Sequence, residues 1–430
     1  MEIGWQDGDV ASQVNPPRGM RDFLPAEKAR RERMLGVIRD TYRAHGFDEI
    51  ETPVVEDSDR LHAGLGGDNE KLAFGVLKRG LTHDDLQKAE EPLDLVDLGL
   101  RFDLTVPLAR FYATHRAELP AVFRSIQVAP VWRAERPQKG RFRQFVQCDI
   151  DIIGEPGIAA EAELLSATLS AVDALGLEGA TIRVNDRRLL IGMLQSFGFA
   201  PDEFDGVLIT LDKMDKIGQD GVLAELRERG VTPAAVDALD AHFARPMTME
   251  YLPFGEAAIR KFAAPDPDPT FVAELASLAD AVDPARLQFD PFLVRGMGYY
   301  TGPIFELAHP SVDYSLGGGG RYDGMIGRFL GTEVPATGFS LGFERLVQLV
   351  ELPAAASADA IALVHYADVP LASLVGIQKG LIAGGARVRL VTRPKNVKPT
   401  LEALAADGFT RFGFVDAQTT AQTLELRDLG

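Results

Sequence analysis

Two segments of the chain alternate between apolar and polar residues regularly enough to predict strands with one core face and one polar face. In residues 95–106 every even position is apolar, whereas the odd positions include Asp97, Arg101, Asp103 and Thr105. In residues 142–152 only Gln144 interrupts the alternation. The polar face of this second segment carries Arg143, Gln147, Asp149 and Asp151, with Phe145 among them.

The neighbouring segments suggest how these strands are connected. A strand is predicted at residues 126–135, and Pro137 to Gly140 predict a turn before the next strand, so we expect an antiparallel hairpin. Helical spacing predicts helices that begin at Pro25 and Pro107, and a further helix over residues 161–177. A strand over residues 47–55, stopped by Pro53, follows the first helix.

The second half of the chain changes character twice. Residues 180–290 are mostly helical in pattern and suggest an inserted subdomain, and strand-like segments return at 292–307, 315–324 and 335–346. A Pro/Ala-rich linker at 352–360 then marks a boundary. Beyond the linker, three apolar runs alternate with helical stretches at 369–383 and 398–406, which predicts a small α/β domain.

Composition narrows the class of protein. The 430 residues are 46% hydrophobic and 25% charged, as in ordinary globular proteins. No apolar run is long enough to span a bilayer, and no signal peptide is visible, so we expect no membrane association. The single cysteine, Cys148, fits a cytoplasmic protein and is expected to be packed on an apolar face. The seven histidines form no metal-binding pattern, so we expect no tightly bound metal.

Charge points to one segment. The formal net charge of −18 argues against nucleic-acid binding through bulk positive charge. Residues 133–145, however, hold five Arg or Lys residues against one Glu. The ordinary interpretation of such a strand face is a solvated surface with cross-strand ion pairs. The functional one is a site for a phosphate and a zwitterion together, because arginine binds phosphate and Asp103 or Asp151 can hold an ammonium or an imidazole N–H.

Two further features are ambiguous from the residues alone. Tyr299 and Tyr300 are adjacent aromatics of the kind that most often pack in a core. The glycine run in residues 315–324 lacks the spacing of a phosphate-binding loop. Consecutive glycines in a strand more often mark the close approach of another backbone or a flat ligand.

Five segments in order resemble the histidyl-tRNA synthetase family of class II aminoacyl-tRNA synthetases. They are LRFDLTVPLAR (100–110), VWRAERPQKGRFRQFVQCDIDIIG (131–154), LVRGMGYYTGPIFE (293–306), GGGRYDGMI (318–326) and GFSLGFERL (338–346). Residues 185–190 and 211–218 also resemble the family's inserted helical region. The resemblance covers nearly the whole chain.

The resemblance implies an α+β fold, with an antiparallel sheet flanked by helices. The catalytic core would comprise residues 1–180 and 291–350, the helical insertion 181–290, and a shortened C-terminal α/β domain, similar to anticodon-binding domains, 359–430. A homodimer would form through the helix and strand around Pro53. The implied partners are L-histidine, ATP with Mg²⁺, and tRNA(His).

The resemblance also implies a role for individual residues. Those expected at the reacting phosphate are Arg133, Arg295 and Arg345. Those expected to bind ATP are Arg133, Glu135, Arg141, Arg143 and Arg345. Those expected to bind histidine are Asp103, Thr105, Gln147, Asp151, Arg295, Tyr299 and Tyr300. Those expected to contact tRNA are Arg136, Gln138 and Lys139.

Two departures from the family pattern leave alternatives open. Gly298 stands where an acidic residue is usual, so support for Arg295 is expected from elsewhere. The C-terminal domain also ends early, which leaves anticodon contact open. One alternative is a paralogue acting as a regulatory subunit of ATP phosphoribosyltransferase. The other is a duplicated synthetase that transfers histidine to something other than tRNA.

Overall fold

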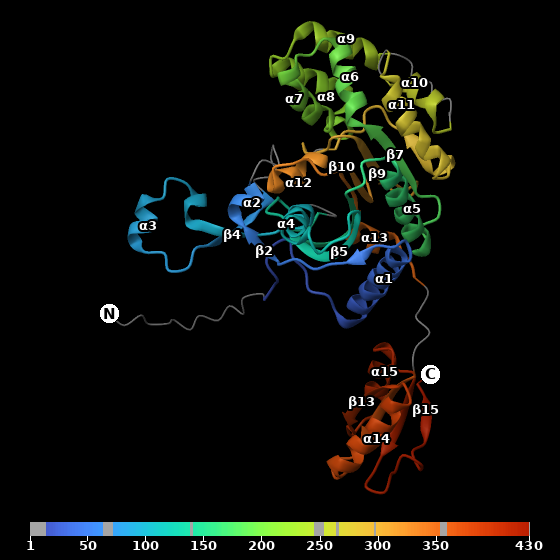
Figure 1. Cartoon of the computed structure of the whole chain (residues 1–430). Helices are drawn as coiled ribbons and strands as arrows, with labels where there is room; N and C mark the ends of the chain where they lie inside the picture. Colours follow the sequence, from blue (N-terminus) through green and yellow to red (C-terminus); the bar gives the residue numbers. More distant parts are fainter. Residues whose placement is uncertain are drawn as a thin grey trace. The chain divides into compact units, whose positions relative to one another are not determined.

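The computed structural model describes residues 14–62, 72–137, 141–244, 253–263, 266–295, 298–352 and 359–429. The chain divides into two compact units, Met1–Glu351 and Leu352–Gly430 (Figure 1). The division comes at the start of the predicted linker. Among the described helices, none has the length and apolar character needed to cross a membrane.

An eight-stranded sheet forms the centre of the first unit. Its order is β1 (Asp48–Glu49), β5 (Phe123–Trp132), β6 (Gln144–Ile153), β11 (Ala336–Gly342), β10 (Gly317–Arg321), β9 (Pro303–Ala308), β7 (Thr181–Asp186) and β8 (Leu287–Phe289). The two outermost pairs are parallel and all inner pairs are antiparallel. The predicted antiparallel hairpin is therefore confirmed as β5–β6.

Two long helices cover one face of this sheet. They are α1 (Pro25–Ala44) and α5 (Ala159–Ala174), which pack together and against β5 and β6. The helix α1 begins with a proline, as expected, and buries Met34, Ile38 and Tyr42 at intervals of four. The short helix α13 (Phe343–Leu349) contacts β6 and carries Glu344, whose carboxylate pairs with Arg31 of α1 at 2.6 Å. These contacts cover this face of the sheet and join α13 to α1.

A smaller sheet lies beside the main one, in the order β2 (Val55–Asp57), β4 (Val96–Leu100) and β3 (Phe74–Leu77). Short helices accompany it: α2 (Ser58–His62), α3 (His83–Lys88) and the 3₁₀ segment Pro92–Leu95. The predicted strand over 47–55 is wrong as one element, because the chain around Pro53 passes from β1 in one sheet to β2 in the other.

The strand predicted over residues 95–106 is too long. The helix α4 (Thr105–His115) already begins where the strand was expected to continue. The apolar residues Phe102 and Leu104 are fully buried, but Arg101 and Asp103 are only 2% exposed and Leu98 is 37% exposed, so burial does not follow the predicted alternation. Asp103 Oδ1 accepts a hydrogen bond from Val106 N at 3.2 Å, which stabilises the turn into the helix. Asp103 and Thr105 therefore lie at a helix start rather than in a strand.

The helical region contains α6 (Arg187–Phe197), α7 (Phe204–Leu211), α8 (Met214–Glu228), α9 (Pro233–Phe243), α10 (Glu256–Phe262) and α11 (Pro269–Ala276). Three short 3₁₀ segments accompany them: Pro201–Glu203, Ser277–Asp280 and Pro284–Arg286. Figure 1 shows these helices gathered beyond β7 and β9, in green to yellow. Both ends of the predicted insertion, residues 181–290, belong to the main sheet as β7 and β8. Their pairing, Ile182 with Leu287, joins positions too distant in sequence for a local pattern to reveal.

The second unit has the predicted β–α–β–α–β order. It contains β12 (Ala360–His365), α14 (Leu371–Ala383), β13 (Arg387–Thr392), α15 (Lys398–Ala406) and β14 (Arg411–Val415). A fourth strand, β15 (Leu426–Asp428), adds to β14 in the antiparallel sense. The sheet order is β13-β12-β14-β15, with the first three strands parallel.

Candidate active site

A cavity of about 980 Å³ is lined by β6, β9, β10 and β11 together with the segment that leads into α4, the loop after β5 and the segments after α7 and β8. Because successive residues of a strand point to opposite faces, Gln147 and Asp151 of β6 line the cavity, whereas Cys148 is turned away and packs in the core. The expected residues that line it are Asp103, Thr105, Arg133, Glu135, Arg141, Gln147, Asp151, Arg295, Tyr299, Tyr300 and Arg345.

The cavity lining includes hydrogen-bond acceptors without partners among the described residues. Asp103 is 2% exposed and Gln147 is 8% exposed, yet neither Asp103 Oδ2 nor Gln147 Oε1 has a hydrogen-bond partner within the described residues. A buried acceptor left unsatisfied costs about 1–3 kcal/mol. Gln147 Oε1 is a hydrogen-bond acceptor, and Asp103 Oδ2 is one when the carboxyl group is ionised. This part of the cavity therefore fits a ligand group with several hydrogen-bond donors, such as an ammonium.

The buried carboxyl groups of the cavity lining are destabilised when they ionise, and a bound cation would offset that free-energy cost. Burial raises the pKa of Asp103 to about 6 and that of Asp151 to about 7. Burial, followed by the negative charge of Asp151, also raises the pKa of Asp149 well above its usual value. Since each ionised carboxylate destabilises its neighbours, a positively charged ligand would be bound in preference to a neutral one.

Aromatic residues line the cavity beside Asp151. The Tyr322 hydroxyl donates to Asp151 Oδ1 at 2.6 Å, and the rings of Tyr299 and Tyr322 lie 6.0 Å apart. The ring of Tyr300 lies 4.7 Å from that of Tyr299. On the neighbouring strand, a Cβ at Gly338 would lie 1.9 Å from Asp151 Oδ1. Glycine is therefore required at this position if the carboxylate is to lie flat against β11.

The cavity lining also contains several cations. Arg133 donates from Nε to the carbonyl oxygen of Phe102 at 3.0 Å, and its guanidinium lies 5.0 Å from the ring of Phe145. Burial lowers the pKa of Arg345, and the nearby charges of Arg141 and Arg295 lower it further. A group of arginines that disfavour one another's charge fits a polyanion such as a nucleotide phosphate.

Arg295, which lies in the loop before β9, forms an ion pair with a carboxylate of that strand. Its Nη1 lies 3.0 Å from Glu306 Oε2 of β9. Burial works to lower the pKa of Arg295, but Tyr300 and Glu306 outweigh it and raise that pKa. A Cβ at Gly318 would come within 2.7 Å of Arg295 Cζ, so the glycine run allows the guanidinium to lie against β10. Glu306 thus provides a counter-charge that Gly298 cannot.

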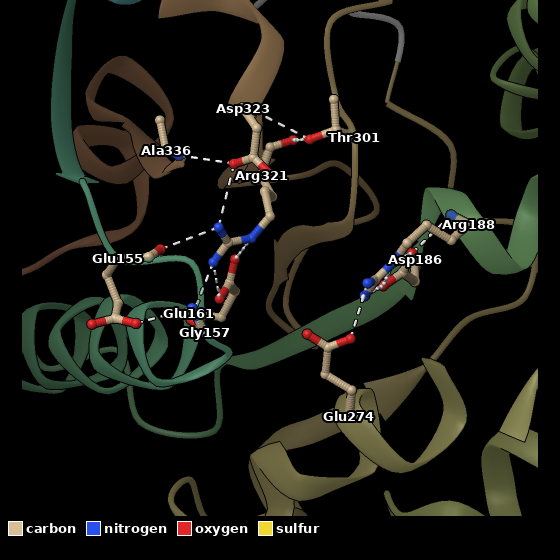
Figure 2. Close-up of polar contacts among 10 residues, drawn as sticks. All are labelled: Glu155, Gly157, Glu161, Asp186, Arg188, Glu274, Thr301, Arg321, Asp323 and Ala336. Carbon is tan, nitrogen blue, oxygen red and sulfur yellow. Dashed lines mark hydrogen bonds and ion pairs between the residues drawn. The ribbon is translucent and has the colours of Figure 1, made fainter. Parts of the chain in front are cut away.

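Figure 2 shows the polar network at the end of β10 that places Tyr322. Arg321 donates to Glu161 at 2.7 and 2.8 Å, and to the carbonyl oxygens of Glu155 and Gly157, both at 3.2 Å. Both members of the ion pair are buried. Since Tyr322 is the next residue, anchoring Arg321 to α5 fixes the backbone from which the hydroxyl reaches Asp151.

The same view shows how the sheet meets the helical region. Asp186, at the end of β7, accepts from Arg188 at 2.7 Å, and Arg188 also pairs with Glu274 of α11 at 2.9 Å (Figure 2). The segment after α7 contributes Asp212 and Met214 to the cavity. The helical region is therefore tied to the sheet and takes part in the cavity wall.

Comparison with known proteins decides the family. A model of the histidyl-tRNA synthetase family matches residues 19–346. The chain belongs to the histidyl-tRNA synthetase family. A histidine--tRNA ligase of Leifsonia xyli subsp. xyli is 60% identical over 98% of this chain and 99% of its own length. A probable histidine--tRNA ligase of Tropheryma whipplei is 42% identical over 94% of this chain and 96% of its own.

Solved structures agree with the expected α+β fold. The histidyl-tRNA synthetase from Nostoc sp. PCC 7120 has a TM-score of 0.74 at 26% identity, covering 96% of this chain and 94% of that one. A structure from Bacillus halodurans described as an ATP phosphoribosyltransferase regulatory subunit/histidyl-tRNA synthetase reaches 0.71 at 20% identity, over 94% of this chain and 97% of its own. The second likeness shows the fold alone.

Not every residue expected from the histidyl-tRNA synthetase pattern faces the cavity. Arg143 does not line it, because its Nε donates to the carbonyl oxygen of Glu135 at 3.0 Å and its guanidinium lies 6.0 Å from the ring of Phe74. Strand β6 begins only at Gln144, so the alternation does not extend back to residue 143. Arg136 is exposed and also lies outside the cavity lining. Gln138 and Lys139 fall outside the described residues.

Sequence reasoning missed several residues of the cavity wall. Tyr322, Glu306 and Ser340 received no role, because their partners lie on strands far away in the sequence. Asp149 was placed on the correct face but not assigned. The period of two that places Gln147 and Asp151 in the cavity is the signal that could have identified it.

Proposed function

We propose that this chain is a histidine--tRNA ligase that joins L-histidine to ATP and then transfers the histidyl group to tRNA(His). The observation that carries the proposal is the composition of one cavity. The cavity combines unpartnered acceptors at Asp103 and Gln147 with a group of arginines. That combination suits an amino acid whose carboxylate meets a nucleotide phosphate.

For histidine, we propose that Asp103 and Gln147 accept from the α-ammonium, with Thr105 beside them. Asp151, aligned by Tyr322, would accept from one imidazole N–H. Tyr299 and Tyr300 are the remaining contacts expected from the family. A site that pairs both polar ends of the ligand rejects analogues that lack them by about 10⁴–10⁵-fold, because buried groups would be left unpaired.

For ATP, the proposed first step is attack of a histidine carboxylate oxygen on the α-phosphorus. The new P–O bond forms as the bond to the bridging oxygen of pyrophosphate breaks. Arg133, Arg295 and Arg345 would stabilise the negative charge that develops on the α-phosphate, because fixed cations need no reorganisation during the step. Glu135 and Arg141, which lie 3.6 Å apart, are proposed to bind the nucleotide.

Mg²⁺ would arrive with ATP on its outer phosphates, as part of the substrate. In the second step, a ribose hydroxyl at the 3′ end of tRNA attacks the histidyl carbonyl carbon and AMP leaves. Arg136, Gln138 and Lys139 remain predicted tRNA contacts. The homodimer, the cytoplasmic location and any reading of the anticodon by the second unit also remain predictions.

The test is histidine-dependent exchange of pyrophosphate into ATP, followed by charging of tRNA(His). We expect both activities. Absence of exchange would overturn the ligase proposal and favour the regulatory-subunit alternative, which has less support from the relatives. Exchange without charging would favour the duplicated synthetase.

A variant locates the chemistry within the cavity. Arg133→Ala is expected to lower the exchange rate by at least about 10²-fold, the effect of losing one preorganised charge contact. Arg79→Ala is the matched control, since Arg79 is exposed and does not line the cavity. An Arg133→Ala rate within threefold of wild type would remove Arg133 from the reacting phosphate.

A further inference from the structure

Asp149 lines the cavity and has no part in the mechanism above. It is 5% exposed and lies on β6 between Gln147 and Asp151. Across the β6–β11 pair its partner is Ser340. A buried carboxylate between two proposed histidine contacts is energetically unfavourable, so its contacts indicate what it does.

The side-chain hydrogen bonds of Asp149 involve Gln147 and Ser340. Gln147 Nε2 lies 3.3 Å from Asp149 Oδ2, 3.4 Å from Asp149 Oδ1 and 2.9 Å from Ser340 Oγ. The NH₂ end of the amide is therefore turned toward Asp149 and Ser340. Its oxygen, Oε1, is the buried acceptor without a described partner.

The two neighbours differ in what they can enforce. A serine hydroxyl donates or accepts, so Ser340 alone would satisfy the amide in either orientation. An ionised carboxylate only accepts, so a reversed amide would bring Oε1 against the Asp149 oxygens. Burial and the charge of Asp151 raise the pKa of Asp149, so the selection applies to the ionised form, which a bound ammonium favours. In that form Asp149 is the group that selects one orientation.

We propose that Asp149 is a positioning residue that holds the Gln147 amide with Oε1 available to the substrate ammonium. The inference rests on the proposed function, because it takes the ligand to be an amino acid whose ammonium meets Gln147. Asp149 itself need not touch the ligand. Its contribution is to prevent the donor end of Gln147 from facing a group that can only donate.

Asp149→Asn keeps the shape and removes the selection. An asparagine offers either an oxygen or an NH₂ group to Gln147, so both amide orientations become acceptable. In the reversed orientation, Nε2 would oppose the ammonium. Because a hydrogen bond to a charged group is lost, we expect ammonium-bearing ligands to bind at least about tenfold more weakly.

The experiment is calorimetric binding of three ligands to the full chain. L-histidine and L-histidinol carry the ammonium, and 3-(imidazol-4-yl)propionate lacks it. In Asp149→Asn we expect Kd to rise about tenfold for the first two and to stay within twofold for the third. An equal loss for all three, or no loss for any, would overturn the proposal.

Two further measurements keep the result interpretable. Ser340→Ala should raise Kd for L-histidine by less than threefold, and a larger effect than that of Asp149→Asn would assign the selection to Ser340 instead. A thermal unfolding curve establishes that Asp149→Asn is folded. Since binding is measured directly, wild-type binding without pyrophosphate exchange would sink the ligase proposal while leaving the positioning of Gln147 tested.

Discussion

The free-energy cost of burying the Asp151 carboxylate in the proposed histidine pocket can be measured. The Asp151 side chain is 4% exposed, and Oδ1 accepts from the Tyr322 hydroxyl at 2.6 Å. Asp151→Asn keeps an oxygen for that hydrogen bond and removes the charge. We expect the free variant to be more stable than wild type at neutral and alkaline pH, and to bind histidine more weakly.

The magnitude follows from the ionisation of the carboxyl group. Burial is the main reason that the pKa of Asp151 rises from 3.8 to about 7 in the folded chain. Between these values the folded chain retains a proton that the unfolded chain releases, so stability falls as pH rises from about 4 to about 7. At roughly 1.4 kcal/mol per pKa unit, the ceiling is about 4 kcal/mol. After relaxation we expect about 1–4 kcal/mol above pH 7 and almost none at pH 4.

The assay is urea unfolding of wild type and Asp151→Asn between pH 4 and 8, following the transition of the first unit. Asp97→Asn, at an exposed position of β4, is the matched control and should differ from wild type by less than about 0.5 kcal/mol at every pH. A variant no more stable than wild type at pH 8, or a difference independent of pH, would refute the reasoning. Histidinol binding should weaken at least tenfold in Asp151→Asn at pH 8.

Two other variants test packing beside the cavity. Gly318→Ala should lower the exchange rate at least about tenfold, because the added Cβ would lie 2.7 Å from Arg295 Cζ. In the control Gly324→Ala the added Cβ meets nothing within 4 Å, so this variant should exchange at the wild-type rate. Equal rates for the two variants would contradict the packing argument. Glu161→Gln breaks the buried ion pair with Arg321 shown in Figure 2 and should lower the free energy of unfolding in urea by about 3–5 kcal/mol. Glu163→Gln, which breaks a partly exposed pair with Arg124, should lower it by less than about 1 kcal/mol. Similar losses would show that burial does not matter here.

The length of the strand ending at Leu100 shows where local pattern fails. Apolar residues continue at even positions through Val106, and Phe102, Leu104 and Val106 are buried, although Arg101 and Asp103 at odd positions are buried as well. The backbone nevertheless leaves the strand, because the Asp103 carboxylate accepts from Val106 N and the helix begins at Thr105. Periodicity identified the apolar side chains after Leu100 that meet the core, and a single side-chain hydrogen bond can change the backbone that carries them.

Arg143 shows where the alternation of β6 ends, while its contact with ATP remains a prediction. Because Arg143 and Gln147 lie an even number of positions apart, the alternation predicted that Arg143 faces the cavity. The resemblance predicted that Arg143 binds ATP. Because β6 starts one residue later, the side chain instead meets the Glu135 carbonyl and the Phe74 ring. Parity holds only within the strand, and the strand's first residue is set by pairing with β5.

By itself, the sequence determined the hairpin β5–β6, the helix α1, the small C-terminal α/β unit and the set of residues on the polar face of β6. Each of these depends on interactions within a short stretch of chain or on a period that burial imposes. Only the tertiary structure decided that Tyr322 aligns Asp151, that Glu306 holds Arg295 and that Gln147 turns its oxygen away from Asp149 and Ser340. Most of these contacts join residues far apart in sequence that the register of β6, β9, β10 and β11 brings together, and a slip of one residue would turn the strand side chains to the other face.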